Sequence, residues 1–392
     1  MASTTEFRRE ARAWVEQNFP TGVRDADMPA GGQKMPSPNP ANLTWLERCA
    51  AKGYTVPTWP VAYGGAGLDK SLYLVLLEEM RRVGAPQPLG GMGVTMIGPT
   101  LLEFGTDEQK ARHLPPIARG EIRWCQGYSE PAAGSDLASL RTRADDRGDH
   151  FVINGQKIWT SGAQYADWMF ALVRTNPDAP KHDGISFVLL TMDQPGVKVR
   201  PIRLISGASP FCETFFTDAV ARKDDLVHQL NKGWTVGKRL LQHERSGLSS
   251  LAAGRTRLAG RPVQAMAKDY LGTRAGKLAD PALREQILRH DITARAFQLT
   301  QRRAVEEAEG TNTPGFATSI FKLYGAEIGK NDSELKMAVM GTQGLGWEGP
   351  NYSDEELAAQ RLWLSGKAGS IAGGSNEVQL NIIAKRVLGL PD

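Results

Sequence analysis

The feature that most constrains the fold is a block of short β-type runs enclosed by helical stretches on both sides. Five runs rich in β-branched, aromatic and other apolar residues follow one another at short spacing: Phe151–Ile153, Trp168–Val173, Ile185–Leu190, Val197–Ile202 and Glu213–Phe216. Strands at this spacing, without intervening helices, are typical of a small sandwich or barrel. Asn154-Gly155 follows the first run directly and predicts a tight type I′ hairpin turn.

Helical periodicity predicts α-helices before and after this block. On the N-terminal side we expect helices over 4–19 and 72–83, a loop over 29–40, and a helical hairpin over 95–119 broken by Gly105 and Pro115-Pro116. On the C-terminal side we expect helices over 234–259, 281–309, 313–340, 355–365 and 375–388. The chain of 392 residues is therefore predicted to be an α+β protein with three domains, 1–122, 123–232 and 233–392.

Composition and charge favour an ordinary cytoplasmic protein. The net charge is +4 with scattered Lys and Arg, which favours neither nucleic acid nor a membrane surface as partner. No run of about eighteen apolar residues exists, so no transmembrane helix is expected. Three distant cysteines without CxxC spacing predict a reducing compartment and no zinc site. The six histidines show no metal-ligand spacing, and Rossmann, P-loop and GxSxG motifs are absent.

Three segments carry residue types suited to binding a ligand. Tyr128–Asp136 combines Pro131, Gly134 and the hydroxyls of Ser129 and Ser135, which suit phosphate or carbonyl oxygens; a simple turn after a strand is the alternative. In Lys157–Gly162, Trp159 beside hydroxyl residues either covers an aromatic cofactor or belongs to the β core. Ile371–Glu377 reads as a glycine loop before a helix, whose free N–H groups either bind an oxygen or are only capped.

Glu244 is the sharpest local anomaly among the charged residues. It lies on an apolar helical stripe formed by Val236, Leu240, Leu248 and Leu251. Burial of a carboxylate on such a face raises its pKa toward the range of a general base. Neutralisation of Glu244 by Arg245 or another base within a helix bundle is the alternative.

Taken together, these segments resemble the acyl-CoA dehydrogenase family over nearly the whole chain. Five stretches carry the resemblance, in order: Ser129–Asp136, Asn154–Trp159, Phe211–Phe216, Asn231–Trp234, and Gly373–Gln379 with Ile382–Ala384. The resemblance implies an α–β–α protomer with a C-terminal domain of the four-helix-bundle type, assembled as a tetramer. It also implies FAD as cofactor, an acyl-CoA substrate and an electron-transfer flavoprotein as acceptor.

The resemblance assigns roles by position. Tyr128, Ser129 and Ser161 would contact the polar edge of the isoalloxazine, with Trp159 alongside and with Gly134 and Ser135 near the pyrophosphate. Gly373 would present a backbone N–H to the thioester carbonyl, and Ser375 and Glu377 would lie near FAD. Such an N–H stabilises the enolate that forms when a base removes the α-proton.

Two departures from the family pattern refine these expectations. Many members carry the base in the closing loop, where this chain has Gly373. A branch that acts on branched-chain, long-chain and some bulky acyl groups instead places Glu before Arg on the first long C-terminal helix, as Glu244-Arg245 does. Arg245 is then expected beside the substrate.

The second departure concerns the cross-subunit half of the FAD site. The family's Arg-x-x-Phe-Gly is not recognisable, which leaves Arg274 and Arg284 as replacement cations, and Met340–Gly346 resembles its Gln-x-x-Gly-Gly segment only loosely. A homotetramer, a heterotetramer with a second family member, a non-catalytic partner subunit and an oxygen-using oxidase therefore remain open. A nucleic-acid-binding relative is disfavoured, because no basic patch or C-terminal extension is present.

Overall fold

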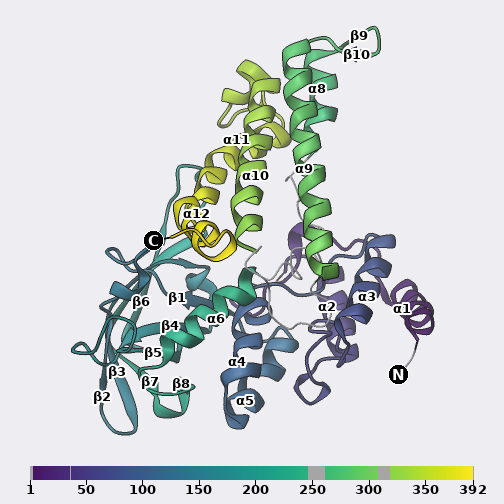
Figure 1. The fold of residues 1–392 in the computed structure, drawn as a ribbon. Helices are drawn as coiled ribbons and strands as arrows, with labels where there is room; N and C mark the ends of the chain where they lie inside the picture. Colours follow the sequence, from purple (N-terminus) through teal and green to yellow (C-terminus); the bar gives the residue numbers. More distant parts are fainter. Residues whose placement is uncertain (1–2, 36, 246–260, 308–317, 392) are drawn as a thin grey trace. The chain divides into compact units, whose positions relative to one another are not determined.

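A computed structural model describes residues 3–35, 37–245, 261–307 and 318–391 (Figure 1). The chain forms two compact units: Met1–Ile202 with Ser209–Glu244, and Arg203–Ala208 with Arg245–Asp392. The first unit contains helices and a mixed sheet, and the described part of the second is mainly helical. The predicted α+β class and the α–β–α order of elements along the chain are confirmed.

The first unit begins with a helical part. Its α-helices are α1 (Thr4–Asn18), α2 (Pro40–Lys52), α3 (Lys70–Arg82), α4 (Gly98–Phe104) and α5 (Asp107–Ala118). Buried side chains from α1, α2 and α3, such as Phe7, Trp45 and Leu76, share one core. The sequence did not predict α2, although Asn39 caps it by accepting a hydrogen bond from the Ala41 N–H and Pro40 occupies its first position.

The predicted break at Pro115-Pro116 is wrong, whereas the break at Gly105 is confirmed. Both prolines lie in the C-terminal half of α5, which continues to Ala118. A proline removes one helical N–H, and near a helix end this loss is tolerated when tertiary packing holds the last turn. Leu114 and Ile117 supply that packing, because both are buried in the core shared with the sheet.

Within the described residues, eight strands form one sheet in the first unit. They are β1 (Trp124–Gly127), β2 (Arg143–Asp146), β3 (His150–Ser161), β4 (Trp168–Arg174), β5 (Ile185–Thr191), β6 (Val197–Ile202), β7 (Phe211–Arg222) and β8 (Leu226–Val227). The strand order is β6-β7-β3-β2-β4-β5-β8, with β1 parallel to β4. Most pairs are antiparallel, as expected for a barrel or sandwich.

The predicted hairpin at Asn154-Gly155 is wrong. Strand β3 runs straight through this dipeptide, and its register against β7 shifts between Ile153 and Gly155. A Cβ at Gly155 would lie 2.6 Å from Thr142 Oγ1. The glycine therefore allows β3 to approach the segment at Thr142 closely, and it does not form a turn. The actual turn between β2 and β3 lies at Gly148, where φ is 96°.

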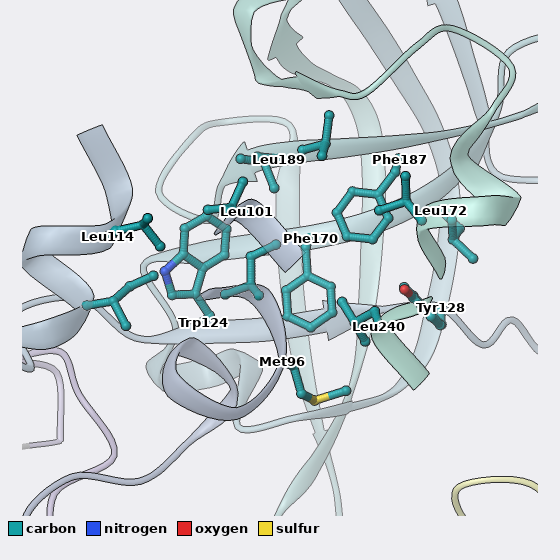
Figure 2. Packing of buried hydrophobic residues seen from close by; sticks show 14 of the residues in the cluster. Met96, Leu101, Leu114, Trp124, Tyr128, Phe170, Leu172, Phe187, Leu189 and Leu240 are labelled. Carbon is teal, nitrogen blue, oxygen red and sulfur yellow. The ribbon is translucent and has the colours of Figure 1, made fainter. Parts of the chain in front are cut away.

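Both faces of the β4–β5 pair are buried. Phe170, Leu172, Phe187 and Leu189 face a core that also contains side chains from α4, α5 and helix α6 (Gly233–Arg245). The alternate residues of β4 and β5 face a second core lined by β3 and β7. Figure 2 shows the first core, in which Leu240 of α6 lies beside the rings of Tyr128 and Phe170. Helix α6 is thereby anchored on the sheet.

The second unit contains α8 (Val263–Leu271), the hairpin β9 (Thr273–Arg274)–β10 (Lys277–Leu278), α9 (Pro281–Glu307), α10 (Thr318–Met340), α11 (Asp354–Gly366) and α12 (Asn376–Ile382). The predicted C-terminal helices are found in the described residues, α6 is described only to Arg245, and α8 was not predicted. Helices α8, α9 and α10 share a core around Met266, Ile287 and Leu335. No described helix is long and apolar enough to cross a membrane.

Candidate cofactor and active site

Two of the segments singled out in the sequence lie side by side in the first unit. The Ile158 N–H donates to the Ser129 carbonyl oxygen at 2.9 Å, and Lys157 Nζ donates to the Tyr128 carbonyl oxygen at 3.0 Å. The end of β1 therefore runs against the second half of β3. Tyr128, Ser129 and Trp159, which lie some thirty residues apart in the sequence, are brought to one place.

Trp159 is exposed because β3 contains a bulge at this point. The register against β7 shifts between Lys157 and Thr160, and both of these side chains are buried. Thr160 Oγ1 is fixed by bonds to the Cys212 carbonyl oxygen and to Thr214 Oγ1, each 2.9 Å long. Trp159 adopts φ 60°, and its side chain is 53% exposed. A bulky residue in this conformation costs of order 1–3 kcal/mol, which is typical of functional positions.

Ser161 and Gly162 end the same strand. Ser161 pairs in register with Phe211 of β7, whose ring meets Trp159 edge-on at 6.0 Å between centroids. Gly162 has φ 64° and turns the chain away, and its N–H donates to the Pro210 carbonyl oxygen. Ser161 itself is half-buried.

The loop with Gly134 and Ser135 is closed at its base by Glu130. One carboxylate oxygen accepts from the Arg141 N–H at 2.6 Å and the other from the Thr142 N–H at 2.9 Å. Gly134 and Ser135 are exposed, and a Cβ at Gly134 would meet nothing within 4 Å. The loop thus presents open backbone and a hydroxyl beside the Tyr128–Ser129 segment.

A buried ion pair joins Glu130 to strand β3. Lys157 Nζ is 2.8 Å from Glu130 Oε1, and Lys157 is fully buried. Burial lowers the pKa of Lys157 to about 8, although Glu130 opposes this effect. Burial also acts to raise the pKa of Glu130, but the charge of Lys157 and the bonds from Lys157, Thr142 and Arg141 outweigh it, so the pKa is lowered overall.

The Tyr128 ring connects this region to α6. It meets the rings of Phe170 and Phe187 edge-on, and a Cβ at Gly237 of α6 would lie 3.5 Å from Tyr128 Oη. Glu244 and Arg245 are the last described residues of α6, but their side chains lie outside the described part of the structure. Val236 and Leu240, two turns and one turn before Glu244, are both fully buried.

The remaining predicted residues belong to the second unit. Gly373 and Gly374 both have positive φ, and Ser375 caps α12 through a bond from the Val378 N–H. Glu377 is exposed, and bonds from its own backbone N–H and from Ser375 lower its pKa. Arg274 is exposed in the β9–β10 hairpin, and Arg284 lies in the first turn of α9.

The first-unit residues fit the chemistry of FAD. Gln126 Nε2 on β1 is buried and has no hydrogen-bond partner among the described residues, so it is a donor available to a ligand oxygen. Ser129, Ser135 and Ser161 add hydroxyls, and Trp159 adds an exposed aromatic face. Carbonyl and phosphate oxygens together with a flat ring system match this set.

Sequence reasoning missed the roles of Lys157, Glu130 and Gln126. The sequence marks Lys157 only as the first residue of Lys157–Gly162, and it singles out neither Glu130 nor Gln126. The sequence did offer one signal for Lys157, because a lysine in a strand of mainly apolar buried residues must be paired with an acid if it is buried. Gln126 follows two buried residues and offers no comparable signal.

Three family profiles match the chain in sequence order. They are described as the acyl-CoA dehydrogenase N-terminal domain over residues 2–121, the middle domain over 125–219 and the C-terminal domain over 231–388. The chain is 39% identical over 391 residues to acyl-CoA dehydrogenase IpdE1 of Mycobacterium tuberculosis, an alignment that covers 100% of this chain and 99% of the relative.

Solved structures agree with these matches. One described as the Tcur3481-Tcur3483 steroid ACAD has a TM-score of 0.78 and 32% identity, covering 100% of this chain and 98% of the other. The ChsE4-ChsE5 complex from Mycobacterium tuberculosis has a TM-score of 0.77 and 31% identity, with the same coverage. The chain therefore belongs to the acyl-CoA dehydrogenase family, as an oxidoreductase whose cofactor is FAD.

Proposed function

We propose that the protein introduces the α,β double bond of a trans-2-enoyl-CoA into a branched or bulky acyl-CoA, with Glu244 as the base. The observation that carries this assignment is the anchoring of α6, in which Val236 and Leu240 are fully buried against the sheet. Glu244 occupies the next position of the same helical row, one turn after Leu240. The described part of α6 that leads to Glu244 packs in the same core as Tyr128, which supports a base near the Tyr128–Ser129 segment.

The chemistry divides between the cofactor and the chain. FAD, when bound, supplies the acceptor for the hydride that leaves the β-carbon. Glu244 takes the α-proton as the general base. The backbone N–H at Gly373 donates to the thioester oxygen; such a donor is typically worth about 2.7–4 kcal/mol of transition-state stabilisation. Arg245 lies next to the base and contacts the substrate.

We propose the following roles for the cofactor residues. Tyr128, Ser129, Ser161 and Trp159 hold the flavin ring, and Gly134 and Ser135 hold the pyrophosphate. Ser375 and Glu377 at the start of α12, and Arg274 in the β9–β10 hairpin, complete the proposed FAD contacts. We also propose the division into domains 1–122, 123–232 and 233–392. The third domain contains Glu244 and the loop with Gly373, and the first is helical.

Anaerobic bleaching of the flavin by acyl-CoA tests the base. Glu244→Gln preserves the size of the side chain and removes its basicity, so we expect reduction to slow by at least about a thousandfold while FAD stays bound. Gln242→Glu in the wild-type background is a matched control on the same helix, which adds a carboxylate without removing the proposed base. Full bleaching rates in a folded, flavin-loaded Glu244→Gln variant would exclude Glu244 as the base.

The substrate class rests on the position of the base and on the relatives. A glycine at 373, where many family members carry a glutamate, leaves room beside the thioester. Two similar structures are described as a steroid ACAD. A panel of acyl-CoA thioesters should therefore show the highest kcat/KM with branched, cyclic or steroid-type side chains. A clear preference for short linear chains would contradict this substrate class.

We further propose that the protein works in a tetramer, either with copies of itself or with a second family member. Leu288, Ile292 and Leu299 form an exposed apolar row on α9 at spacings of four and seven residues. Two similar structures are complexes whose descriptions name two proteins. Ile292→Glu should reduce the assembly in native mass spectrometry, and the exposed Thr293→Glu on the same helix should not. Turnover and FAD binding by the single chain would exclude a non-catalytic partner role.

An electron-transfer flavoprotein is the proposed acceptor of the electrons. Steady-state turnover with this acceptor should exceed turnover with oxygen alone, since the enzyme is proposed to be a dehydrogenase. Faster turnover with oxygen would favour the second candidate function, an oxidase.

A further inference from the structure

The segments that we assign to the cofactor share one internal support. Lys157 lies in β3, two residues before Trp159, and donates to both the Tyr128 carbonyl oxygen and the Glu130 carboxylate. Glu130 in turn accepts from the Arg141 and Thr142 N–H groups. Two side chains thus hold four pieces of the chain: the end of β1, the two sides of the base of the 131–140 loop, and the bulge of β3.

We infer that Lys157 and Glu130 are positioning residues that set the geometry of the cofactor segment by tying Tyr128–Ser129, the Gly134–Ser135 loop and the Trp159 bulge to one another. This inference rests on the assignment of those segments to FAD. Neither side chain is accessible enough to contact the cofactor as a surface group, because Lys157 is fully buried and Glu130 is 8% exposed. They act through the backbone that they hold.

The network is suited to positioning because each bond fixes a different piece of chain. The Lys157–Tyr128 bond fixes the end of β1, since it holds the carbonyl oxygen of the residue whose ring contacts α6. The two bonds to Glu130 bring Arg141 and Thr142 back to the point where the loop begins. The loop that carries Gly134 and Ser135 is therefore closed at its base and cannot drift away from Ser129.

Stability alone is a poor explanation for such a pair. Taking two charges out of water costs free energy that their attraction only partly returns, and buried pairs replaced by apolar or neutral groups of similar volume often leave stability unchanged or improved. Removal of one partner, by contrast, leaves a buried unpaired charge. The double replacement Lys157→Met/Glu130→Gln therefore separates positioning from stability, because it removes both bonds from Lys157 and one of the two bonds at the base of the loop without leaving a buried charge.

The experiment measures FAD release and the visible spectrum of the flavin in the holoenzyme. On serial dilution, Lys157→Met and the double variant should release FAD with a dissociation constant at least about tenfold higher than the wild type, a loss typical of a broken charge-assisted bond. The absorption bands of the flavin that stays bound should shift, reporting altered contacts. If Lys157→Met does not fold, the double variant carries the test.

Glu79→Gln is the matched control. Glu79 is also a buried carboxylate held by basic side chains, but it joins α1 to α3. Its replacement should lower the unfolding temperature and leave FAD dissociation and the flavin spectrum unchanged. Wild-type dissociation and spectrum in the folded double variant would overturn the inference, as would an equal loss of FAD in Glu79→Gln.

Two further variants, Trp159→Ala and Ser129→Ala, show whether the positioning role or the assignment of these segments to FAD is wrong. Trp159→Ala changes a proposed contact and leaves the Lys157–Glu130 pair intact. If Trp159→Ala and Ser129→Ala both bind FAD like the wild type, then the assignment of these segments to the cofactor is wrong. If they lose FAD and the double variant does not, only the positioning role is wrong.

Discussion

Glu79 provides a test of how burial and charge hold the helical part of the first unit. It is 2% exposed on α3 and accepts bonds from Arg12 Nε at 2.9 Å, Arg82 Nε at 3.0 Å and Arg8 Nη1 at 3.1 Å. The bond from Arg12 is the largest of the effects that lower the pKa of Glu79 to about 2, and burial opposes them. We expect Glu79→Gln to loosen the docking of α1 on α3.

The magnitude follows from the pKa. A change from 4.5 to about 2 corresponds to about 3 kcal/mol of stabilisation of the folded state at neutral pH. The arginine side chains are 39–49% exposed, so solvent screens part of this effect, and about 1–2 kcal/mol is the expected cost. Because the folded pKa is the lower one, the stabilisation is present above pH 4.5 and is lost as the pH falls toward 2.

Hydrogen exchange of the α1 amides measures this cost locally. At pH 7, protection in Glu79→Gln should fall by about 5- to 30-fold relative to the wild type. The deficit should stay constant down to about pH 5 and shrink by pH 3. Glu78→Gln is the control, because Glu78 is 52% exposed with one ion pair to Arg8 and should cost under about 1 kcal/mol. Equal protection in the wild type and Glu79→Gln, or a deficit that persists unchanged at pH 3, would refute the reasoning.

Three further predictions concern packing and backbone strain. Leu240→Ala removes a fully buried side chain from the core shared by α6 and the sheet; it should cost about 2–5 kcal/mol in thermal unfolding and slow flavin bleaching as well. Trp159→Gly relieves the strain of the positive φ at the bulge, so the unfolding temperature should hold or rise while FAD dissociates more readily. A lower unfolding temperature would count against stored strain. Gly65→Ala places a Cβ 2.1 Å from the Trp59 carbonyl oxygen, so soluble yield and unfolding temperature should both drop sharply, unlike those of Gly90→Ala, whose Cβ meets nothing within 4 Å.

The order of elements could be predicted because, in each part of the chain, the spacing of apolar residues fits either a helix or a strand. The β4 and β5 runs are apolar at nearly every position, and the structure buries both of their faces. Asn154-Gly155 misled the prediction because its local turn preference competes with pairing along β7. That pairing, including bonds between Asn154 and Asp218, keeps β3 extended through the dipeptide. A tertiary contact of this kind leaves no trace in local sequence.

In the candidate site, too, local sequence patterns could be predicted and tertiary contacts could not. Motifs identified Ser129 and Trp159 one by one, and the structure brings their segments together through the Ile158–Ser129 bond. The partnership of Lys157 with Glu130 could not be predicted, because it joins residues 27 positions apart across two strands. The role of Glu244 remains a prediction, supported by the buried row that precedes it on α6.

If Glu244 is the base, as we propose, the placement of α6 explains how a base on a helix can be held as precisely as one in a closing loop. A base must keep its distance from the thioester within a fraction of an ångström, which a loop achieves only if its ends are fixed. On α6 the constraint comes from the core instead, since Val236 and Leu240 are fully buried beside Tyr128, Phe170 and Phe187. The same Tyr128 is held from its backbone by Lys157. A change at either end of this chain of contacts should therefore disturb the cofactor segment and the base helix together, so Leu240→Ala and Lys157→Met are expected to be less than additive in flavin bleaching.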